Sequence, residues 1–157
     1  PTFDTLLAEM RRRGTIMEPT LFIYMMDGRE RLGAMAAEVT RRAHARGVMI
    51  VAGTDSLGSG DEGVWTPPNL HEELRLLVRE AGLSSADALA ASTRNAARAV
   101  GAESERGTVE PGKLADFVVL DRDIMTVAPE DILGARVMMT VLGGRVVYKL
   151  EAPGAAR

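Results

Sequence analysis

The chain has 157 residues, of which 46% are hydrophobic and 26% charged, with a formal net charge of −3 and a pI near 5.5. These values are ordinary for a folded domain, and they argue against a nucleic-acid-binding protein, which normally carries a basic stripe. There are no cysteines, so disulfides and thiolate metal sites are excluded.

Helical spacing and short apolar runs alternate in the first third of the chain. Phe3, Leu6, Leu7 and Met10 predict a helix that ends at Gly14, and Thr15–Tyr24 predicts a short strand broken by Pro19 and followed by a loop. A second helix follows, with a stripe from Leu32 to Ala43, and closes at Gly47. Val48–Val51 is a continuous apolar run, typical of a strand buried on both faces in a parallel sheet. This alternation is typical of βα units.

The middle of the chain predicts a loop and three helices. Gly53–Pro68 has the composition of a loop, and the next helix begins near Asn69 and stops at Gly82. Ser84 is placed to cap a further helix, with Ala86, Leu89 and Ala90 facing inward. A short helix over 95–100 ends at Gly101.

From residue 103 the pattern becomes that of a small β segment. Pro111-Gly112 suits a type II turn, and Phe117–Leu120 predicts a strand. Val137–Leu142 and Arg145–Tyr148 predict two strands joined at Gly143-Gly144 as a hairpin. We expect the tail 151–157 to be frayed. The longest apolar runs are far too short to span a bilayer, so no membrane association is expected.

Asp55 is the most informative polar residue, because it directly follows the predicted buried strand 48–51 in VMIVAGTD. Ligand sites in α/β folds lie at the carboxyl ends of strands, which suits a catalytic or metal-binding carboxylate. A loop Asp that caps a turn by Asx hydrogen bonds fits the position equally well.

Four blocks, in order, carry a family resemblance: VAGTDS, LHEELRLLVREAGLSSADALAASTRNAARAVG, GTVEPGKLADFVVLD and VLGGRVVY. Together they resemble the carboxy-terminal end of the amidohydrolase superfamily, in the branch of imidazolonepropionase-like and Xaa-Pro dipeptidase-like enzymes. The resemblance covers residues 1–149 and implies an α/β fold built on a metal-dependent (β/α)8 barrel. We expect 1–102 to be its last two strands and helices, and 103–150 to be a segment of a small composite β-sandwich.

The resemblance also implies a reaction: hydrolysis of an amide-type C–N bond in a dipeptide, cyclic amide or N-acyl compound. Asp55 matches the family's Asp after strand eight, which binds a divalent metal, usually zinc, and carries a proton from activated water to the leaving nitrogen. Tyr24, Met25, Ser56 and His71 are candidate substrate contacts. Packing of an apolar loop fits Tyr24 and Met25 equally well, and for His71 a hydrogen bond at the start of its helix is the preferred interpretation. In GKLADFVVLD the resemblance implies a structural role for Asp116.

The family's His-x-His pair and its other ligands are missing from this sequence, whose histidines are His44 and His71. We interpret His44 as a solvated surface residue. A catalytic zinc takes about three protein ligands, so we expect no metal site in this chain alone. The chain opens on Pro1, and we expect the natural amino terminus, with any targeting signal, to lie outside it; the expected location is cytoplasmic.

Two hypotheses follow. The chain is part of a hydrolase for a small amide or peptide, or it is a stand-alone, non-catalytic module that self-associates. In either case, open strand edges favour a homo-oligomer with an interface drawn from Ile16–Tyr24 and Val48–Ala52.

Overall fold

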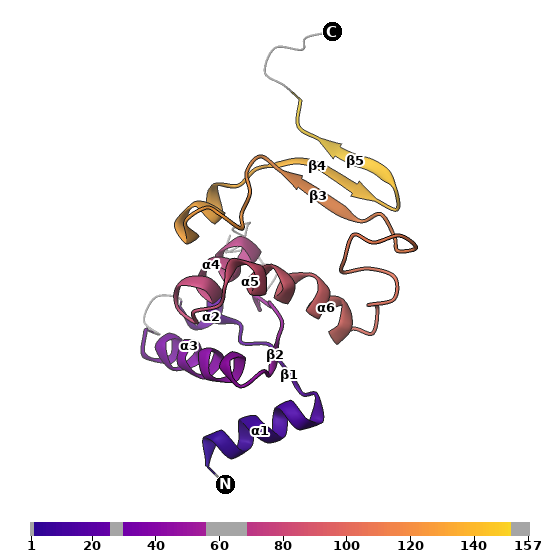
Figure 1. Ribbon diagram of the computed structural model, residues 1–157. Helices are drawn as coiled ribbons and strands as arrows, with labels where there is room; N and C mark the ends of the chain where they lie inside the picture. The colour runs from indigo at the N-terminus through magenta and orange to yellow at the C-terminus, as the bar shows by residue number, and fades with distance from the viewer. Residues whose placement is uncertain (1, 26–29, 56–68, 152–157) are drawn as a thin grey trace, which may run out of the picture.

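The computed structural model describes residues 2–25, 30–55 and 69–151. Helices and two short strands make up its first two thirds, and a three-stranded antiparallel sheet follows at the opposite end from α1 (Figure 1). The elements are, in order, α1 (Phe3–Arg13), β1 (Ile16–Met17), α2 (Leu21–Tyr24), α3 (Glu30–Ala45), β2 (Met49–Ile50), α4 (Asn69–Arg79), α5 (Ser85–Ser92), α6 (Arg94–Ala99), β3 (Phe117–Leu120), a 3-10 helix (Pro129–Gly134), β4 (Val137–Leu142) and β5 (Arg145–Lys149).

The predicted βα alternation is confirmed by the parallel pair β1–β2. Ile16 pairs with Met49 and Met17 with Ile50, and α3 makes the connection between the strands. The backbone N–H of Val51 extends the pairing by donating to the carbonyl of Met17 at 3.0 Å. The carboxyl ends of both strands therefore lie at one edge of the sheet, where the chain runs on to Glu18 and to Asp55.

The prediction for Thr15–Tyr24 is wrong beyond Met17. The strand is only two residues long, and Leu21–Tyr24 forms the short helix α2 instead of a strand and loop. Leu21 is fully buried, so the apolar letters that suggested a strand belong to a helix that packs into the core.

The cap of α5 follows the sequence, but the buried face of this helix does not. Ser84 Oγ accepts the backbone N–H of Asp87 at 3.1 Å and caps α5 as predicted. Ala86, expected to face inward, is exposed, whereas Ala88 and Ala91 are buried. The buried face of α5 is thus turned away from the predicted one, because alanines on every side of this helix leave no contrast between its faces.

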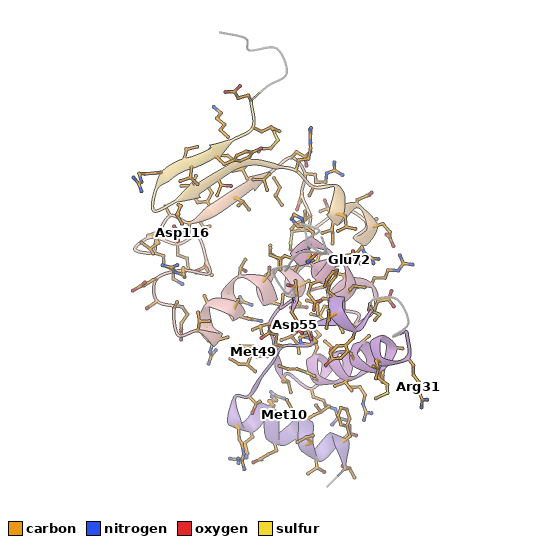
Figure 2. The ribbon with its side chains drawn as sticks, turned by 180° about the vertical axis from the view of Figure 1, so that it is seen from behind. Met10, Arg31, Met49, Asp55, Glu72 and Asp116 are labelled. Atoms are coloured by element: carbon orange, nitrogen blue, oxygen red, sulfur yellow. The ribbon has the colours of Figure 1, made fainter. Side chains whose placement is uncertain are left out.

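The predicted hairpin is confirmed, with β4 antiparallel to both β3 and β5. Gly143 and Gly144 have φ of +56° and +75°, the left-handed backbone that a tight two-residue turn requires and that glycine adopts without strain. Asp116 Oδ1 accepts the N–H of Gly143 at 2.7 Å, and the carbonyl of Ala115 accepts that of Gly144 at 3.1 Å. Ala115 and Asp116 therefore hold the turn between β4 and β5, at the place that Asp116 marks in Figure 2.

The core lies among the helices and the β1–β2 pair. It is built from buried aliphatic side chains, including Leu7, Leu21, Ile50, Leu77 and Ile132. The three-stranded sheet contributes little to this core, because every residue of β5 is exposed. No helix in the described ranges is long and apolar enough to cross a membrane.

Candidate functional site

The backbone that leads to Asp55 is held on both sides. On one side, Val51 is bonded to β1 as described above. On the other, the N–H of Ala52 donates to the carbonyl of Ala91 at 3.1 Å, and the side-chain amide of Asn95 donates to the carbonyl of Ile50 at 2.9 Å. The strand end therefore has little freedom, and Asp55 projects from a fixed support. Figure 2 marks the residue where the chain leaves β2.

Asp55 itself is exposed, with a φ of +48°. Asp tolerates the left-handed region better than most residues, because its short side chain is polar and unbranched at Cβ. The other non-glycine residue of positive φ in the described chain is Thr20, which follows β1 as Asp55 follows β2. Such backbone conformations cluster at functional sites.

The carboxylate of Asp55 forms no hydrogen bond or ion pair with the rest of the described chain. The Asx turn considered as its alternative role would bond to the backbone that follows Asp55, which lies outside the described residues, so that alternative stays open. An exposed carboxylate without a partner among the described residues, on a rigid strand end, can accept a proton or bind a cation.

A second carboxylate, Glu18, lies beside this strand end. Its side chain covers Gly53 so closely that a Cβ at Gly53 would overlap Glu18 Oε1. Gly53 is therefore the residue that lets the two strand ends approach each other. Glu18 was not predicted as a site residue, and its only signal in the sequence is its place directly before Pro19, which interrupts the predicted strand Thr15–Tyr24.

Of the predicted substrate contacts, Tyr24 lines a pocket. The pocket has a volume of about 290 Å³, and its walls come from β1, α2, α3 and the segment between β1 and α2: Met17, Glu18, Pro19, Tyr24, Leu32, Met35, Ala36, Val39 and Thr40. Most of these side chains are apolar, which suits an apolar part of a ligand. Asp55 is not among the lining residues.

Met25 lies against the core, His71 lies at the start of α4, and Ser56 lies outside the described residues. Met25 packs against the core, and a Cβ at Gly33 of α3 would lie 2.5 Å from its sulfur. His71 stands in the first turn of α4, and its Nδ1 is buried without a hydrogen-bond partner in the described part of the chain. The preferred hydrogen bond at the helix start is thus not made by that nitrogen.

Glu73, two residues further along α4, is fully buried. Its carboxylate accepts the backbone N–H of Leu21 at 3.0 Å and that of Phe22 at 2.7 Å. Burial raises the pKa of Glu73 from 4.5 to about 7, against the lowering effect of those two N–H groups, and the charges of Glu18 and Glu72 raise it further. Nothing in the local sequence marks Glu73 for this role.

The described residues contain no group of three or more His, Cys, Asp or Glu side chains close enough to hold a metal ion. His44 lies on α3 with its Nε2 3.5 Å from Asp87 Oδ2, as a partly exposed surface residue. Asp55 fits a divalent cation by its chemistry, because a free carboxylate is a ligand for both zinc and harder cations.

Comparison with known proteins defines the class. The amidohydrolase family matches residues 14–148, and the chain belongs to that family. Its characterised members hydrolyse C–N bonds. The chain is 39% identical over 72 residues to a 5-methylthioadenosine/S-adenosylhomocysteine deaminase of Symbiobacterium thermophilum, covering 40% of this chain and 16% of the relative. It is 51% identical over 47 residues to an imidazolonepropionase of the same organism, covering 30% of this chain and 11% of the relative.

Solved structures agree on the fold. An ochratoxinase of A. niger matches with a TM-score of 0.74 at 21% identity, over 98% of this chain and 37% of that one. A Xaa-Pro dipeptidase matches with a TM-score of 0.70 at 24% identity, over 91% of this chain and 36% of that one. The mixed α/β arrangement is therefore that of amidohydrolases, and the chain spans little more than a third of the length of these structures.

Proposed function

We propose that this chain forms the carboxy-terminal part of a metal-dependent amidohydrolase that hydrolyses an amide-type C–N bond, with Asp55 as its proton-carrying carboxylate. The observation that carries the proposal is the position of Asp55: exposed, without a partner in the described chain, and fixed at the carboxyl end of β2. The family match over residues 14–148 supports the reaction class.

Within this proposal, β1 and β2 are the last two strands of a (β/α)8 barrel, in residues 1–102. Their parallel pairing through α3 supports the assignment, because a barrel is built by repeating that unit. Residues 103–150 then form a segment of a small β-sandwich, and 151–157 a tail. The exposed strand β5 supports the idea that this sheet packs against further chain in the complete enzyme.

The proposed chemistry uses a divalent cation, zinc in the first instance, which lowers the pKa of water so that hydroxide is available near neutral pH. Asp55 would supply one ligand. Its second task is proton transfer: a carboxylate oxygen accepts the proton of the attacking water and later donates it to the leaving nitrogen. The rigid hydrogen bonds around residues 50–52 keep that oxygen in place between the two transfers.

A small amide or peptide is the proposed substrate, whether a dipeptide, a cyclic amide or an N-acyl compound. The apolar pocket beside Tyr24 supports an apolar substrate group there. His71 is proposed as a second contact, since its buried Nδ1 lacks a partner in the described chain. Ser56 adjoins Asp55 in sequence and keeps its proposed role on that basis alone.

We propose in addition that the isolated chain forms a homo-oligomer through Ile16–Tyr24 and Val48–Ala52. The described β1–β2 sheet has only two strands, so the outer edge of each strand is unpaired among the described residues. Such surfaces favour association. A purely non-catalytic module is the less favoured reading, because the relatives named above include a deaminase and an imidazolonepropionase.

The test is Asp55→Asn in the complete enzyme. Asn keeps the size of the side chain but cannot take a proton from water, so kcat should fall while the fold is unchanged. Asp131→Asn is the matched control, because it makes the same substitution at an exposed residue of the 3-10 helix. A variant Asp55→Asn with near-normal kcat would overturn the assignment.

A further inference from the structure

The short helix α2 cannot be explained by its own sequence. It has only four residues, Leu21–Tyr24, and an isolated helix of one turn is unstable in water. The residue before it, Thr20, has a left-handed φ of +49° and makes no capping hydrogen bond with its side chain. The free N–H groups of the first turn therefore need acceptors from elsewhere.

Glu73 supplies those acceptors from α4, 51 and 52 residues further along the chain. One carboxylate oxygen accepts the N–H of Leu21 at 3.0 Å and the other accepts that of Phe22 at 2.7 Å. Both Glu73 and Leu21 are fully buried, so water cannot replace either bond. A carboxylate at the start of a helix also has favourable electrostatics with the helix dipole.

The segment that Glu73 holds reaches the candidate site at both ends. Before it, Glu18 lies against Gly53, two residues from Asp55. After it, Tyr24 forms part of the wall of the 290 Å³ pocket. Since α2 packs against both α3 and α4, a shift of its first turn moves Tyr24 relative to the α3 side of the pocket.

We propose that Glu73 is a positioning residue of the amidohydrolase site: its buried carboxylate fixes α2, and through α2 it fixes Tyr24 at the substrate pocket. The role of this pocket in substrate binding rests on the proposed function. Glu73 touches neither Asp55 nor the pocket, so it acts only through the backbone that it holds.

The hold is sensitive to protonation. A carboxylate offers two acceptor oxygens, whereas a neutral carboxyl group carries a proton on one of them and opposes one of the two N–H groups. The pKa of Glu73 is raised to about 7, by burial first and also by the neighbouring carboxylates of Glu18 and Glu72. Both N–H bonds are therefore expected above pH 7, and one of them is weakened as the pH falls below 7.

The experiment is NMR on the full chain, with the ring signals of its two tyrosines as probes. In the wild type, the ring chemical shifts of Tyr24 should report the titration of Glu73, with a midpoint near pH 7, while Tyr148 on the distant strand β5 serves as an internal control. Glu73→Gln should abolish that titration and reduce the protection of the Leu21 and Phe22 amides from exchange at least about ten-fold at pH 8. Glu80→Gln is the matched control, because Glu80 is exposed just after α4, pairs with Arg79 and makes no bond to α2.

A pH response of the Tyr24 ring that persists in Glu73→Gln, or unchanged protection of both amides, would overturn the proposal. If Glu73→Gln fails to fold, amide exchange in the wild type decides: Leu21 and Phe22 amides that exchange as fast as exposed amides contradict the proposal. These measurements need no turnover, so their failure is distinct from failure of the hydrolase proposal, which the Asp55→Asn enzyme tests.

Discussion

The burial of Glu73 predicts an unusual dependence of stability on pH. In the folded chain its pKa is about 7, against 4.5 for the free side chain, so the folded state holds a proton that the unfolded state releases. The contribution of Glu73 to stability is thus present below pH 4.5 and is lost as the pH rises through 7. At about 1.4 kcal/mol per pKa unit, the loss amounts to about 3 kcal/mol.

Glu73→Gln removes this term, because the amide stays neutral throughout. We expect urea denaturation to show that the wild type loses about 3 kcal/mol of unfolding free energy relative to Glu73→Gln between pH 4.5 and 8. Glu80→Gln, which removes an exposed charge just after the same helix, should keep the wild-type slope. Parallel pH curves for the wild type and Glu73→Gln would refute the reasoning.

Three further predictions concern the sheet, the metal and association. Asp116→Ala removes the acceptor of the Gly143 N–H and should lower the unfolding free energy by about 1 kcal/mol in urea titration; no measurable change would show that the turn is held otherwise. Calorimetric titration of the isolated chain with zinc should detect only weak surface binding, and stoichiometric binding at micromolar affinity would contradict the ligand count. Sedimentation should find an oligomer, most simply a dimer, and a well-folded monomer at micromolar concentration would count against the interface at Ile16–Tyr24 and Val48–Ala52.

Elements governed by local rules could be predicted from the sequence. The helix that ends at Gly14, the cap at Ser84 and the hairpin at Gly143-Gly144 each depend on residues a few positions apart. The 3-10 helix Pro129–Gly134 was not predicted, since six residues carry too little periodicity. The strand prediction at Thr15–Tyr24 failed because α2 depends on an acceptor more than fifty residues away.

The same limit applies to the candidate site. Asp55 could be singled out because it follows an apolar run, which is a local pattern. Glu18 and Glu73 could not, because Glu is normally exposed and nothing nearby marks either residue as packed against another strand or helix. For Met25 the sequence leaves substrate contact and apolar packing open, and only the structure shows that Gly33 leaves space for its sulfur beside the core.

The most direct test of the central claim is the kcat of the complete amidohydrolase with Asp55→Asn, measured beside Asp131→Asn and with matched circular dichroism spectra. If Asp55 carries the proton between water and the leaving nitrogen, kcat should fall at least about a hundred-fold with little change in KM, while the control keeps wild-type turnover. A folded Asp55→Asn enzyme that retains near-normal kcat would contradict the account.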